Sequence, residues 1–70
     1  PAAFNAANEV AVAEFLAGRL PFLAISRVVE QVLGALRNFE PHSLDEALQA
    51  DAEARRLAHR FLAAPALPSR

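Results

Sequence analysis

The clearest pattern in the sequence is an apolar stripe near its middle. Apolar side chains recur there at i, i+3, i+4 and i+7 spacing, whereas Arg27, Glu30 and Arg37 face away. This repeat matches the α-helical period, so it predicts an amphipathic helix over about 23–37. Pro21 fits only before that helix or in its first turn. The stripe consists of Phe22, Ile25, Val28, Val29, Val32, Leu33 and Leu36.

A preceding helix is predicted over about 6–17. Asn5 is the expected N-cap residue, and Gly18 is suited to follow the C-terminus. Glu14 lies roughly opposite the apolar face, while Asn8 falls inside it and should bond the turn before it or a neighbouring segment. The expected core face consists of Ala7, Ala11, Val12, Phe15 and Leu16.

The second half of the chain begins after Pro41, which forbids helix continuation. Ser43 and Glu46 have the S-x-x-E spacing of a capping box, so a new helix is predicted to begin at Leu44. The chain offers no strand-period segment, glycine-rich loop or internal repeat.

Two readings of the segment 44–63 are open. Leu44 and Leu48 define one face, but Leu57 and Phe61 lie about 220° around the helix from them. We therefore favour two helices, 44–50 and 52–63, with Asp51 as the second N-cap. One continuous, bent helix is the alternative.

The predicted fold class is all-α, a small bundle of three to four short helices over about 6–17, 23–37, 44–50 and 52–63. Residues 1–63 form the bundle, and residues 64–70, with two prolines, are expected to be an extended or disordered tail. The start at Pro1 rather than at a methionine suggests a piece of a longer protein.

The length and composition of the chain limit how stable this bundle can be without a neighbouring surface. The chain has 70 residues and no cysteine, so it has neither a large core nor a disulfide or thiolate metal site. It has 17 alanines, which favour helix. We expect an exposed apolar patch that a neighbouring surface covers.

Charge and hydropathy exclude several classes of partner. The net charge is −1 and the basic residues are scattered arginines, which argues against nucleic acid. Uncharged runs such as Leu20–Ser26 are too short to span a bilayer, and no signal peptide is recognisable in Pro1–Ala7. The expected location is cytoplasmic, with no membrane partner.

No catalytic, cofactor-binding or metal-binding residue is predicted. His42 and His59 lack neighbouring ligands, and Asp45 and Glu46 are explained by helix capping. No serine has a histidine at helical spacing. The charged group Asp51, Glu53, Arg55, Arg56 and Arg60 is expected to form i,i+4 pairs on a solvated face.

The run Asn5-Ala6-Ala7-Asn8-Glu9 carries more polar chemistry than one cap needs. It can be an elaborate N-cap or a docking contact with another domain. Its sequence, with the segments around it, resembles the C-terminal region of 1-deoxy-D-xylulose 5-phosphate reductoisomerases. The similarity extends over Phe4–Leu16, Arg19–Ile25, Val28–Leu33, Ser43–Leu48 and Asp51–Arg55.

The resemblance implies a parent enzyme of the non-mevalonate isoprenoid route. Members of the family rearrange and reduce 1-deoxy-D-xylulose 5-phosphate to 2-C-methyl-D-erythritol 4-phosphate, with NADPH and Mg or Mn, as homodimers. The family's nucleotide, metal and phosphate motifs lie upstream of the matched region, so this segment is expected to bind no cofactor and to be inactive alone.

Only Asn5, Asn8 and Glu9 match the marked family run, and the resemblance gives them a structural role at the junction with the catalytic domain. The sequence departs from common members at Pro21 and at Ala24, where an acidic residue is frequent. The hypothesis is thus a non-catalytic C-terminal helical domain that supports the remaining domains of the same enzyme. The alternative is a stand-alone helical protein-interaction module.

Overall fold

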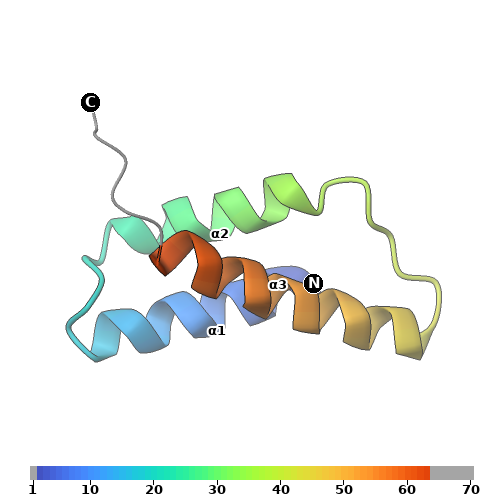
Figure 1. Cartoon of the computed structure of the whole chain (residues 1–70), viewed down its shortest axis with the longest axis horizontal. Helices are drawn as coiled ribbons and strands as arrows, with labels where there is room; N and C mark the ends of the chain where they lie inside the picture. The colour runs from blue at the N-terminus through green and yellow to red at the C-terminus, as the bar shows by residue number, and fades with distance from the viewer. Residues whose placement is uncertain (1, 64–70) are drawn as a thin grey trace.

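Three helices make up the described part of the chain, residues 2–63 of a computed structural model. They are α1 (Ala2–Leu16), α2 (Ala24–Ala35) and α3 (Leu44–Ala63), and each contacts the other two. Successive helices run in opposite directions, and the loops that join them lie at opposite ends of the molecule (Figure 1). Residues 2–63 contain no strand. The predicted all-α bundle is confirmed.

Helix α1 begins earlier than predicted and turns a different face inward. Asn5 lies inside the helix, because the good helix formers Ala2 and Ala3 extend it toward the N-terminus. Its predicted capping role is therefore wrong. Ala7 and Ala11 are buried as predicted, but Leu16 is exposed and Glu14 is half-buried, so the core face is rotated from the predicted one. The buried residues of α1 are Ala6, Ala7, Val10 and Ala11.

The C-terminus of α1 is a Schellman motif, as the glycine led us to expect. Gly18 has a φ of 80°, and its N–H donates to the Phe15 carbonyl at 3.0 Å. The Arg19 N–H donates to the Glu14 carbonyl at 2.9 Å. These two bonds are the pair that defines the motif, and they turn the chain toward α2.

Helix α2 confirms the central stripe, with its ends shifted by one or two residues from the predicted 23–37. Val28, Val29 and Val32 are buried, whereas Phe22 is 65% exposed. Pro21 lies before the helix, and its carbonyl accepts the Ala24 N–H at 3.0 Å. Proline is compatible with this position because the turn does not need its missing N–H.

Helix α3 is continuous, so the favoured split into 44–50 and 52–63 is wrong and the alternative of one helix is right. Its core side repeats at i, i+4, i+7 and i+8 through Ala50, Ala54, Leu57 and Ala58. Leu44 and Leu48 are not part of that face, and both are exposed.

The capping box at the start of α3 is present. Ser43 Oγ accepts the Glu46 N–H at 3.1 Å, and Glu46 Oε1 accepts the N–H of His42 at 2.8 Å. The return bond therefore reaches the residue before the cap rather than the cap itself. Two backbone donors are satisfied, which fixes where the helix begins.

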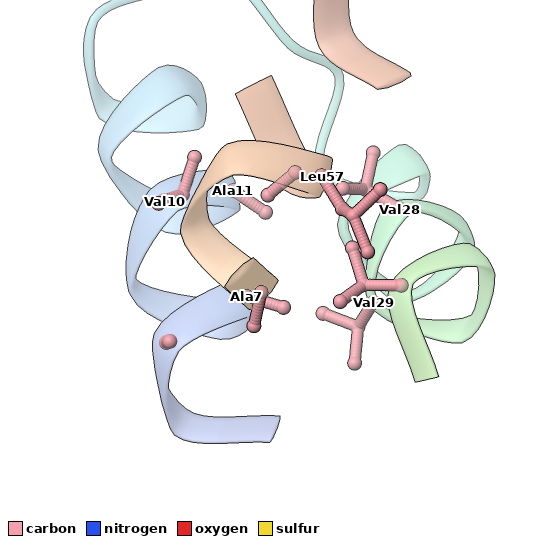
Figure 2. Close-up of a cluster of buried hydrophobic side chains, with 10 residues drawn as sticks. Ala7, Val10, Ala11, Val28, Val29 and Leu57 are labelled. Carbon is pink, nitrogen blue, oxygen red and sulfur yellow. The ribbon is translucent and has the colours of Figure 1, made fainter. Parts of the chain in front are cut away.

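The core between the three helices is built mostly from small side chains (Figure 2). Val32 is the largest side chain that is fully buried. The expectation of exposed apolar surface is confirmed, since many larger apolar side chains lie outside the core. They are Phe4, Leu16, Phe22, Leu23, Leu33, Phe39, Leu44 and Leu48.

The tail predicted at residues 64–70 lies outside the residues that the structure describes. Among residues 2–63, no helix is long and apolar enough to cross a membrane.

The two glycines of the chain provide a matched test of the α1 terminus. Neither position has an atom within 4 Å of an added Cβ, so packing does not distinguish them. Gly18→Ala should destabilise the chain by about 1 kcal/mol because alanine is strained at positive φ. Gly34→Ala, inside α2, should stabilise it by about 0.5–1 kcal/mol. Thermal unfolding followed by circular dichroism measures both, and a Gly18→Ala variant as stable as the Gly34→Ala variant would contradict the assigned turn.

Candidate functional site

The three residues singled out by the sequence, Asn5, Asn8 and Glu9, all lie on α1. Asn5 and Glu9 are exposed and Asn8 is half-buried. None of the side-chain hydrogen bonds found within residues 2–63 involves either asparagine, so the bond predicted for the Asn8 amide is not found there. Glu9 differs, because its carboxylate is bound by a residue of another helix.

Arg55 joins α1 to α3. Its Nη2 donates to Glu9 Oε1 at 2.8 Å, and its Nε donates to Asp51 Oδ2 at 2.8 Å. The hydrogen bonds to Asp51 and then to Glu9 raise the pKa of Arg55 above its ordinary value. Asp51 therefore holds the guanidinium from within α3 rather than capping a new helix.

Only the local part of this ion-pair arrangement could be predicted from the sequence. The i,i+4 pair of Arg55 with Asp51 is confirmed, and Arg56 also binds Glu53 one turn away. The contact with Glu9 is separated by 46 positions, and no local spacing reports it. It appears only when α1 and α3 are packed side by side.

A second ion pair closes the turn between α1 and α2. Arg19 binds both carboxylate oxygens of Glu14, at 2.8 and 2.9 Å, in the bidentate arrangement that favours arginine. The hydrogen bond from Arg19 lowers the pKa of the Glu14 carboxyl. Phe15 and Phe22 stack edge to face beside it, with ring centroids 5.5 Å apart. These contacts tie the α1–α2 loop to the end of α1.

The described residues hold no cluster of potential metal ligands. His42 and His59 are both exposed, and no three His, Asp or Glu side chains in residues 2–63 lie together as metal ligands. An open groove of about 630 Å³ lies between the start of α1 and the α2–α3 loop. It is lined by Ala2, Ala3, Leu33, Leu36, Arg37, Phe39, Glu40, Pro41, His42 and Ala50.

Fold and surface together define a small helical domain, with exposed ion pairs and apolar side chains turned outward. The family model described as the DXP reductoisomerase C-terminal domain matches residues 1–57, and the chain belongs to this family. No solved structure matches the chain significantly.

Several curated proteins are similar to the chain along most of its length. The 1-deoxy-D-xylulose 5-phosphate reductoisomerase of Burkholderia vietnamiensis is 59% identical over 66 residues, and that of Burkholderia multivorans is 61% identical over 66 residues. Each alignment covers 93% of this chain and 17% of the relative. The enzyme of the same name from Paraburkholderia phytofirmans is 53% identical over 62 residues, which is 89% of this chain and 16% of the relative. The chain thus spans about a sixth of the length of these relatives.

The Glu14–Arg19 pair predicts a pH dependence of stability. Because the pKa of Glu14 in the folded chain lies below its ordinary value of 4.5, the pair stabilises the fold above that pH and is lost as pH falls through the folded pKa. Between pH 6 and pH 3, the melting temperature of Glu14→Gln should fall less than that of the unmodified chain. Glu30→Gln, on the exposed side of α2, is the control and should leave the slope unchanged. Equal slopes for the unmodified chain and Glu14→Gln would show that the pair contributes nothing.

Proposed function

We propose that this chain is the C-terminal helical domain of a 1-deoxy-D-xylulose 5-phosphate reductoisomerase and that it supports the catalytic part without supplying a reacting group. The match of the family model to residues 1–57 supports this most directly. The 17% coverage of the relatives supports a part of a longer enzyme. The exposed apolar side chains are those of a domain that another surface completes.

The family resemblance implies that the whole enzyme is a cytoplasmic homodimer that converts 1-deoxy-D-xylulose 5-phosphate to 2-C-methyl-D-erythritol 4-phosphate. It also implies NADPH and Mg or Mn as cofactors. Residues 2–63 do not fit either group, because they bring together no carboxylate set for the metal and no glycine-rich turn for the nucleotide. We place both cofactors on the remainder of the enzyme.

The role of this domain is therefore positional. Arg55 fixes α1 against α3 through Glu9, and Arg19 and Glu14 fix the α1–α2 turn. These contacts hold α1, which carries the Asn5, Asn8 and Glu9 run, in one orientation. A rigid support contributes to catalysis indirectly, because small misplacements of the reacting groups slow an enzyme greatly.

A hybrid enzyme tests the proposal. In the Burkholderia vietnamiensis reductoisomerase, the matching segment is replaced by this chain, or is deleted. NADPH oxidation that depends on 1-deoxy-D-xylulose 5-phosphate should persist in the hybrid, whereas deletion should lower it at least about a hundredfold. The 70-residue chain alone should show no turnover.

An inactive hybrid that is folded, or a deletion variant that is as active as the parent, would contradict the proposal. Either result would favour the alternative, a stand-alone helical protein-interaction module. Far-ultraviolet circular dichroism of the hybrid establishes that it is folded.

A further inference from the structure

Helix α1 has an outer face that differs from the outer faces of α2 and α3. Successive residues on a helix are about 100° apart around its axis. The side of α1 opposite the buried Ala7 and Val10 therefore holds Asn5 and the residues three, seven and eleven positions after it. We call these residues the outer row of α1. They are Asn5, Asn8, Val12 and Leu16.

The outer row carries no charge. Leu16 is 76% exposed, and none of the side-chain hydrogen bonds found within residues 2–63 involves either asparagine. Helix α1 contains two charged residues, Glu9 and Glu14, and arginines from outside the helix bind both. The outer row itself is therefore made of apolar and amide groups, and Glu9, which is exposed at its edge, is paired with Arg55.

The exposed faces of the other two helices carry charged side chains beside apolar ones such as Leu33 and Leu48. Arg27 and Glu30 are exposed on α2, and Arg56 and Arg60 are exposed on α3. Such faces are typical of helices bathed in water. A helix with apolar side chains on both sides is typical of one that is packed on both sides.

We infer that the outer row of α1 is the surface on which the rest of the reductoisomerase chain docks. This inference rests on the proposed function, since the occupant is the part of that enzyme which this chain does not span. That part amounts to about five-sixths of the relatives, so a large covering surface exists. The docking patch must itself be uncharged and apolar, with hydrogen-bonding groups for the amides of Asn5 and Asn8.

The rival surface is the groove of about 630 Å³ between the start of α1 and the α2–α3 loop. Arg37, Glu40 and His42 contribute to its lining, and all three are exposed. Covering it would desolvate the charges of Arg37 and Glu40, neither of which belongs to an ion pair found within residues 2–63. The outer row of α1 imposes no such cost.

Thiol accessibility in the hybrid enzyme tests the inference, because this chain has no cysteine of its own. Leu16→Cys probes the outer row, and Leu48→Cys, at a 59% exposed leucine on α3, is the matched control. The rate of reaction with a water-soluble maleimide is measured for each, after subtraction of the reaction of the unmodified hybrid. In the folded hybrid, the Leu16→Cys thiol should react at least about tenfold more slowly than the Leu48→Cys thiol. In urea, the two should react equally.

Similar rates for the two thiols in a hybrid that turns over substrate would overturn the docking surface and leave the proposed function standing. A slow Leu48→Cys and a fast Leu16→Cys would also overturn it and would place the interface elsewhere on the bundle. A folded but inactive hybrid would remove the proposed function and this inference with it.

Discussion

The small size of the core side chains is the constraint on which the rest of the structure depends. Ala6, Ala7, Ala11, Ala54 and Ala58 are fully buried, and they allow α1 to approach its neighbours closely. Close approach favours dispersion contacts, but each alanine removes little apolar surface from water, since burial contributes about 0.8 kcal/mol per methylene. The larger side chains that would contribute more, such as Leu16 and Leu23, lie outside. The three helices thus pack against one another, but the burial of such small side chains stabilises the bundle only to a limited extent.

The charges of the bundle complement this core. Arg55 holds α1 to α3 and Arg19 holds the turn between α1 and α2, so both carboxylates of α1 are bound. Exposed ion pairs of this kind contribute little to stability, but they orient the helix that bears them. The outer row of α1 is itself uncharged, and Glu9 at its edge is paired with Arg55. The chain belongs to the reductoisomerase C-terminal domain family and spans about a sixth of the length of its relatives.

Those features that depend on local chemistry could be predicted from the sequence. The valine stripe of α2, the glycine that ends α1 and the capping box at Ser43 each follow from a few neighbouring residues. The orientation of α1 could not be predicted, because its apolar residues occur on all sides and periodicity alone does not choose among them. The continuity of α3 does not follow from periodicity, because Leu44, Leu48 and Leu57 are equally apolar and only Leu57 is buried. The Arg55–Glu9 contact depends on tertiary packing and has no local signal.

Dependence on a neighbouring surface is the central claim, and thermal unfolding tests it most directly. Far-ultraviolet circular dichroism would follow the melting of this chain alone, and then of its mixture with the Burkholderia vietnamiensis enzyme from which the matching segment has been removed. The account predicts a broad, low transition for the chain alone that sharpens and moves to higher temperature on mixing. A cooperative transition at high temperature that mixing does not change would contradict it.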